Sequence, residues 1–338
     1  MTTCSEISQL TMTNRTNQFV KIPPIDYGNH PAYGQLFGQP YLQKRYQALR
    51  KFLPYFWRCL KSHLRNSQSR RLKIDDCSSN ISPLLKLLGR NGAVAIKLTL
   101  DEKRVIGETL KYSISLLKDK RSHIPPDKRG FFENMLYLQE NNFQDLYDKI
   151  SQILKKHYLI DIASFYLGKL VRLQKVALHI YDSTDIFLYQ NFSDIKFPDS
   201  ATTYMHIDGG ITNMVKCMIY LNQVNEKNGA FSYVLGSNNF KISFWERVIS
   251  STNSLSDLYK CSYSERELFG ALPKAFQKKA EFGNDLLDSS PESALLMKME
   301  HQFTSEDGDL ILFDNEGIHR GGLVRKGERQ VIELQLYS

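Results

Sequence analysis

The apolar residues of this chain follow a helical period in its first half and a two-residue period in its second half. Over residues 41 to about 64, and again over about 131 to 173, they recur every three or four positions, which predicts helices. From residue 176 onward the period shortens toward two, which predicts strands. The expected strands cover residues 176–181, 186–190, 202–208, 215–221, 231–235, 310–313 and 329–337.

Between the two helical patterns, over residues 82–102, the sequence gives local signals for a helix, a strand and a second helix. Ser82 and Pro83 are typical of a helix start, and a short helix is expected over residues 84–88. A turn at residues 89–92 leads into an expected strand over 93–98. Thr99, with Glu102 three residues later, predicts a capping box that begins the next helix.

Short strands gathered in the second half, with most helices before them, predict an α+β protein with a mainly β core. We expect an antiparallel barrel or sandwich of the jelly-roll kind, flanked by helices. Residues 240–300 become polar and helical again, between strands that are expected to carry chemistry. This insertion is either a lid over the barrel mouth or a surface elaboration.

Composition favours a folded protein of a reducing compartment. The chain has 338 residues, of which 42% are hydrophobic and 12% aromatic, enough for a large core. Its five cysteines are scattered, without the spacing of a zinc ribbon or a disulfide framework. The first eighteen residues are polar and no long apolar stretch occurs, so we expect a cytoplasmic protein without a membrane span.

The formal net charge of +8 is concentrated near the N-terminus. Between Tyr27 and Ile74 there is no acidic residue, whereas residues 41–73 contain many lysines and arginines. Three interpretations stay open: a solvated helix face, an interface for an acidic carrier protein, or a contact with anionic lipid. Nucleic-acid binding is disfavoured because base-reading motifs and stacking modules are absent. We therefore divide the chain into a basic, partly helical extension (1–80) and a main domain (81–338).

One short motif in the strand region has the spacing of a metal site. In an extended strand His206 and Asp208 project from the same face and can bind one ion together. His319, on a later expected strand, would complete a set of two histidines and one carboxylate. Such a set leaves coordination positions open, as a non-heme Fe(II) oxygenase requires. An isolated His-x-Asp is otherwise often an ordinary surface pair, so the neighbouring motifs matter.

Three segments resemble the phytanoyl-CoA dioxygenase family of Fe(II)- and 2-oxoglutarate-dependent oxygenases. They are His206-Ile207-Asp208, residues 226–238 (EKNGAFSYVLGSN), and residues 308–314 leading to His319 and Arg329. The chain departs from the family pattern at Leu235 and Asn238, where proline and histidine are common. The resemblance covers about residues 80–338 and implies a double-stranded β-helix that binds Fe(II) and uses 2-oxoglutarate and O2.

The resemblance also implies that Arg329 holds the distal carboxylate of 2-oxoglutarate. Alternation along the last strand supports this role, because Arg329, Val331 and Glu333 share a face that a ligand would have to neutralise. Arg320 and Arg325 are competitors that we expect on the surface. Lys216 lies in an otherwise apolar strand, so its ammonium group either finds an acidic partner, such as the cosubstrate carboxylate, or faces the edge of the sheet. Tyr189 and Gln190 are further candidates for cosubstrate binding.

The expected activity is the oxidation of a small organic substrate, either free or linked to a carrier or CoA, with release of succinate and CO2. Because Asp208 is present, hydroxylation, desaturation or ring formation is favoured over halogenation, which the resemblance links to loss of this carboxylate. Two alternatives stay open: another metal-dependent protein on a cupin-like barrel, and a protein with this fold that binds a ligand without turnover.

Overall fold

The computed structural model describes the main domain, apart from several loops and one long segment. The described residues are 81–126, 129, 132–184, 205, 214–239 and 296–338, together with positions 50, 53, 56, 57 and 60. The basic extension (1–80) therefore lies almost entirely outside them, as do the predicted strand at 186–190, nearly all of the one at 202–208, and the predicted insertion up to residue 295.

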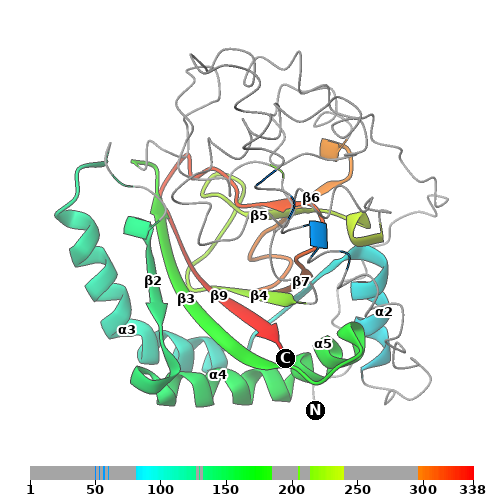
Figure 1. Cartoon of the computed structure of the whole chain (residues 1–338). Helices are drawn as coiled ribbons and strands as arrows, with labels where there is room; N and C mark the ends of the chain where they lie inside the picture. Colours follow the sequence, from blue (N-terminus) through cyan, green and yellow to red (C-terminus); the bar gives the residue numbers. More distant parts are fainter. Residues whose placement is uncertain are drawn as a thin grey trace.

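Nine strands form two antiparallel sheets in the described part of the chain (Figure 1). The six-stranded sheet has the order β1-β7-β4-β9-β3-β2, and the three-stranded sheet has the order β6-β5-β8. The larger sheet consists of β1 (Ala93–Ile96), β7 (Leu310–Asp314), β4 (Val215–Tyr220), β9 (Glu328–Tyr337), β3 (Arg172–Asp182) and β2 (Met135–Leu138). The smaller one consists of β6 (Glu300–Phe303), β5 (Phe231–Val234) and β8 (His319–Arg320).

The chain passes from one sheet to the other several times. Strand β4 lies in the large sheet, β5 and β6 in the small sheet, β7 in the large sheet again, β8 in the small sheet, and β9 in the large sheet. Apolar side chains from both sheets, including Phe231, Phe303 and Phe313, pack between them. This arrangement is a double-stranded β-helix, or jelly roll, and it confirms the predicted fold class.

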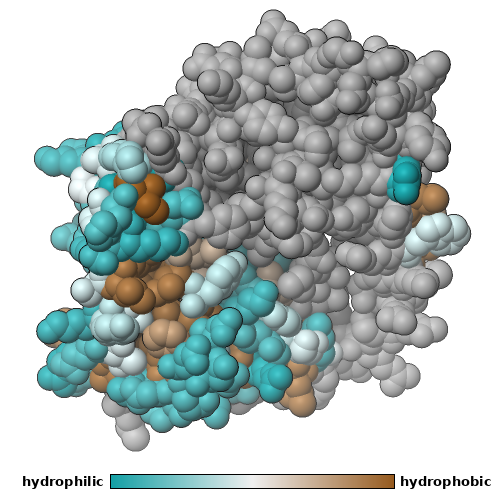
Figure 2. Space-filling view, turned by 60° about the vertical axis from the view of Figure 1, so that its left-hand side comes forward, coloured by the Kyte–Doolittle hydropathy of each residue, from teal (hydrophilic) through white to brown (hydrophobic). Residues whose placement is uncertain are grey.

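Four described helices cover the outer face of the large sheet (Figure 1). In the figure, α3 and α4 lie along the outer side of β2 and β3. The helical side of the molecule presents mostly hydrophilic residues, with a patch of hydrophobic ones between them (Figure 2). None of the described helices is both long and apolar enough to cross a membrane. The helices are α2 (Ser82–Asn91), α3 (Leu100–Ser122), α4 (Gln144–Lys156) and α5 (Leu159–Leu167).

Strand β9 shows why the two faces of the large sheet differ. Its outward side chains, Ile332, Leu334 and Leu336, are fully buried in the core beneath the helices. Its inward side chains include Arg329 and Gln335, which are charged or polar and still only 4% exposed. The predicted alternation is confirmed, and it places a polar row inside the jelly roll.

The local start signal of helix α3 is confirmed in atomic detail. The Thr99 side chain accepts a hydrogen bond from the Glu102 backbone, and the Glu102 carboxylate accepts one from the Thr99 backbone at 2.7 Å. Lys156 and His157, at the end of α4, also contact Glu102. Although burial opposes ionisation, Lys156, the backbone of Thr99 and His157 together lower the pKa of Glu102 to about 2. One carboxylate therefore caps α3 and joins it to α4.

Two predicted regions need correction. The helical pattern expected over residues 131–173 is interrupted by β2, an edge strand paired with β3. Its sequence, Met-Leu-Tyr-Leu, is too short for its period to distinguish a strand from a helix. Strand β6 was also not predicted, because its residues Glu300-His301-Gln302-Phe303 are mainly polar and pairing with β5 fixes them as a strand.

Candidate metal and cosubstrate site

His319 lies on the inner side of the small sheet, opposite Tyr233 on β5. The side chain is buried, and its Nδ1 lies 2.9 Å from the carbonyl oxygen of Gly317. A carbonyl oxygen only accepts, so Nδ1 carries the proton and donates it. This hydrogen bond fixes the orientation of the ring, as a backbone carbonyl does for many metal-ligating histidines.

Three aromatic rings fix the orientation of this imidazole. The ring centroids of Phe313, Phe231 and Tyr233 lie 5.2, 5.8 and 6.2 Å from that of His319, and the Tyr233 ring is nearly parallel to it. The Tyr233 hydroxyl donates to the backbone oxygen of Asp314 at 3.0 Å. Gly317 leaves room for this hydroxyl, because a Cβ atom at that position would lie 1.7 Å from it.

A buried polar network holds the turn between β7 and His319. Tyr166 of α5 donates to the Asp314 carboxylate at 2.5 Å, and the Glu316 backbone N–H donates to its other oxygen at 2.9 Å. Burial raises the pKa of Asp314 to about 6, and the nearby Glu316 adds to this effect. The carboxylate therefore stays buried at neutral pH only because donors surround it.

The segment Leu235-Gly236-Ser237-Asn238 supports the same turn from the opposite side. The Ser237 hydroxyl accepts a hydrogen bond from the Ile318 backbone at 2.7 Å. Asn238 donates to the Tyr166 hydroxyl at 3.1 Å and to a backbone oxygen of helix α2. Sequence comparison marked this segment only as a motif, and the structure shows that it positions the turn that leads to His319.

Arg329 lies at the start of β9 on the inner face of the large sheet, where it is only 4% exposed. Its Nη1 donates to the carbonyl oxygens of Gly229 and Gly322, and its guanidinium carbon lies 4.9 Å from the centroid of the Tyr181 ring. Its Nε is buried without a hydrogen-bond partner, and no carboxylate of the described residues forms an ion pair with it. Burial accordingly lowers the pKa of this guanidinium.

Gly229 allows the close approach of Arg329 to the backbone. Its φ is +85°, and a Cβ atom there would lie 2.6 Å from the Gly322 oxygen and 3.2 Å from Arg329 Nη1. Any other residue would push the loop away from the guanidinium group. Gly229 thus has a physical role in holding the arginine.

Lys216 has the acidic partner that its position in an apolar strand demanded. Its Nζ lies 3.2 Å from the Glu333 carboxylate, and its side chain is 7% exposed. The two residues lie on neighbouring strands, β4 and β9, on the inner face of the large sheet. Contact between Lys216 and a cosubstrate stays a prediction.

The other predicted ligands lie outside the described residues. This holds for His206 and Asp208 of the metal motif and for Tyr189 and Gln190. Within the part of the chain that the structure describes, no group of three or more potential metal ligands occurs. The metal site therefore stays a prediction, of which the structure describes the His319 side.

The two competing arginines differ from each other. Arg325 is exposed, as predicted. Arg320 was expected on the surface, and this is wrong: its side chain is only 11% exposed and forms a two-point ion pair with Glu300 at 2.7 and 2.8 Å. The Ser232 hydroxyl also donates a hydrogen bond to Glu300, so the three side chains form one cluster on the outer face of the small sheet. Because its charge is satisfied, Arg320 is a poor candidate for anion binding.

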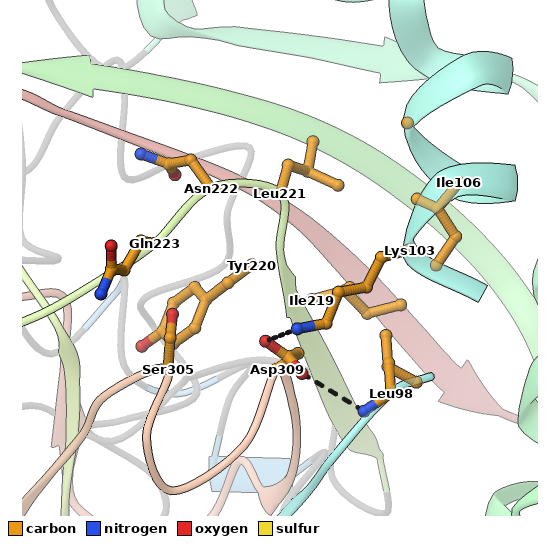
Figure 3. A pocket seen from close by; sticks show the side chains of 11 residues that line it. Leu98, Lys103, Ile106, Ile219, Tyr220, Leu221, Asn222, Gln223, Ser305 and Asp309 are labelled. Atoms are coloured by element: carbon orange, nitrogen blue, oxygen red, sulfur yellow. Dashed lines mark hydrogen bonds and ion pairs between the residues drawn. The ribbon is translucent and has the colours of Figure 1, made fainter. Parts of the chain in front are cut away.

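A separate pocket of about 360 Å³ lies between α3 and the end of β4 (Figure 3). At its floor Lys103 lies 2.7 Å from the Asp309 carboxylate, which also accepts a hydrogen bond from the Leu98 backbone. These polar groups satisfy one another, so the pocket has no unmet charge that would call for a ligand.

No family model and no curated protein matches the sequence. Among solved structures, AviO1 from Streptomyces viridochromogenes Tue57 is similar at 12% identity and a TM-score of 0.43, over 78% of this chain and 96% of that one. The non-heme alpha ketoglutarate dependent carbocyclase SnoK is similar at 13% identity and 0.45, over 79% and 86%. EctD from S. alaskensis is similar at 13% identity and 0.46, over 80% of each chain. Identities this low concern the fold alone, so chemistry has to be argued from this chain's own residues.

Proposed function

We propose that this protein is an Fe(II)- and 2-oxoglutarate-dependent dioxygenase that oxidises a small organic substrate. The observation that carries the proposal is Arg329, whose buried guanidinium has two carbonyl partners, a Nε without a partner and no carboxylate among the described residues. A buried positive charge without an anion is costly. A dicarboxylate ligand would compensate the charge and accept from the remaining donor.

The proposed metal ligands are His206, Asp208 and His319. For His319 the support is the contact between Nδ1 and the Gly317 carbonyl oxygen, because a backbone carbonyl commonly orients a metal-ligating histidine in this way. The rings of Tyr233 and Phe313 hold the imidazole in one orientation. When bound, iron and 2-oxoglutarate supply the oxidising chemistry, which consumes O2 and yields succinate, CO2 and an oxidised substrate.

Anaerobic titration of the full chain with Fe(II) and then 2-oxoglutarate tests the proposal. We expect a weak visible charge-transfer band when both are bound, and succinate release once O2 is admitted. Arg329→Met should weaken 2-oxoglutarate binding about 100-fold, because it removes charge-assisted hydrogen bonds. Its matched control is Arg325→Met, an exposed site where binding should not change.

Two further outcomes separate the parts of the proposal. His319→Ala and His206→Ala should each remove the band through loss of iron, while folding measured by circular dichroism is retained. Iron binding without 2-oxoglutarate binding would instead identify another metal-dependent protein on the same fold. Binding of neither would overturn the proposal.

A further inference from the structure

Besides Arg329, the inner face of the large sheet carries a cluster of polar side chains farther along β9. Glu333 and Gln335 project from the same face as Arg329, about 13 and 20 Å from it along the strand. Pairing places Gln335 beside Lys216 of β4, and Glu333 beside Ala177 of β3. Between this group and Arg329 lies Val331, which joins the apolar cluster around the Phe231 and Phe313 rings that contact His319.

The amide of Gln335 has only one possible orientation. Its nitrogen donates to the Glu333 carboxylate at 2.9 Å, and the reverse orientation would place two acceptors against each other. The amide oxygen Oε1 therefore points away from Glu333. It is buried without a hydrogen-bond partner, in a residue that is only 4% exposed. A buried acceptor of this kind is satisfied by a donor from an ordered water or from a bound molecule.

Among the described residues, the charged groups beside this acceptor form an ion pair of opposite charges. Lys216 lies 3.2 Å from the Glu333 carboxylate, so the pair is neutral as a unit. His179 on the neighbouring strand is buried as well, and burial lowers its pKa to about 4, so its imidazole is neutral at pH 7. Tyr137 on the edge strand β2 interacts electrostatically with Glu333 and Lys216 and is itself 45% exposed, so this cluster lies beside the edge of the sheet.

We propose that Gln335, with the Lys216–Glu333 pair beside it, recognises a substrate that presents hydroxyl or amino hydrogens, and not one that presents a carboxylate or phosphate group. This inference rests on the proposed function, in which Arg329 and His319 hold cosubstrate and metal at the other end of the row. The Gln335 oxygen accepts the hydrogen bond from the substrate. The balanced pair offers no excess positive charge to an anion.

Three six-carbon probes with the same skeleton test this selectivity: hexane-1,6-diol, hexane-1,6-diamine and adipate. The full chain is loaded with Zn(II), a diamagnetic stand-in, and saturating 2-oxoglutarate, whose binding is first measured by calorimetry. Probe affinity is then measured by ligand-observed NMR. We expect the diol or the diamine to bind and adipate not to bind. The two donor probes show whether the hydroxyl or the ammonium group is preferred.

The variants separate recognition from folding. Gln335→Leu should weaken the donor probes about 10-fold and leave 2-oxoglutarate affinity unchanged. Its control, Gln330→Leu, makes the same change on the opposite face of β9 and should alter neither affinity. Glu333→Gln leaves the Lys216 charge unbalanced and should increase adipate affinity at least 10-fold, a reversal that a merely structural role would not produce.

Each remaining result has a defined meaning. If 2-oxoglutarate binds but adipate is preferred, or if Gln335→Leu leaves the donor probes unaffected, the inference is overturned and the proposed function stands. The same holds if no probe binds the loaded protein. If 2-oxoglutarate does not bind the wild-type protein, the proposed function fails and this inference fails with it.

Discussion

The two faces of the large sheet are built from the same strands and are both largely buried, yet they differ in composition. The outer face carries Leu334 and its apolar neighbours beneath four helices, whereas the inner face carries Arg329, Lys216 and Gln335. Burial of apolar surface stabilises a fold, while burial of charge opposes it. The outer face therefore supplies the stability that offsets the cost of burying polar and charged groups on the inner face.

The largest expected effect is on the outer face. Leu334→Ala removes a fully buried side chain from the helix–sheet core and should lower the free energy of unfolding by about 3 kcal/mol. Urea denaturation measures this loss, and 2-oxoglutarate affinity of the folded variant should stay within twofold of wild type. Leu170→Ala, the same change at a residue that is 88% exposed, should cost less than about 0.5 kcal/mol. A similar loss in both variants would contradict the contrast.

A second prediction uses one titratable group on each face. Burial raises the pKa of Asp314, on the helix side, from 3.8 to about 6, so its contribution to stability is lost as pH rises from 4 to 6. Burial lowers the pKa of His179, on the inner face, from 6.5 to about 4, so its contribution is lost as pH falls through the same window. The two groups therefore contribute opposite slopes to the dependence of the free energy of unfolding on pH.

Urea denaturation between pH 4 and 6.5 separates these contributions. Relative to wild type, Asp314→Asn should make stability rise more steeply with pH, and His179→Gln should make it rise less, each by on the order of 2 kcal/mol across the window. The double variant serves as the control, and its curve should run nearly parallel to that of wild type. Equal slopes in the two single variants would show that neither group titrates as its burial implies.

The smallest expected effect is on the inner face. In the ligand-free protein, Arg329→Met replaces an uncompensated buried charge by an apolar side chain and should raise the free energy of unfolding by about 1 kcal/mol. Loss of the hydrogen bonds to Gly229 and Gly322 limits this gain. Stabilisation by added 2-oxoglutarate should disappear in the same variant. A loss of more than about 2 kcal/mol without ligand would mean that Arg329 serves the fold.

Much of the fold could be predicted because several strands of the large sheet are long or fully apolar on one side. The period of two in β3, β4 and β9 is visible in the sequence since it follows from burial on the outer face, and β7 is visible as a continuous apolar run. The strands that sequence reasoning missed, β2 and β6, are short and lie at sheet edges. Their extended form depends on a partner strand far away in sequence, which no local pattern reveals.

For the candidate site, the sequence could predict the direction of a side chain within one strand, but not its partners on other strands. The inward direction of Arg329 and the need of Lys216 for an acidic partner both follow from single strands, and both predictions are confirmed. The identity of that partner, Glu333, depends on the register between β4 and β9, which lie more than a hundred residues apart. The Arg320–Glu300 pair was missed for the same reason, because it forms between β8 and the unpredicted strand β6.

The two carbonyl contacts of Arg329 have a consequence for ligand binding. Gly229 and Gly322 belong to separate loops, and one guanidinium group binds both before any ligand arrives. The conformational entropy of these loops is therefore lost during folding and not during association. Ligand binding should then not have to order these two loops.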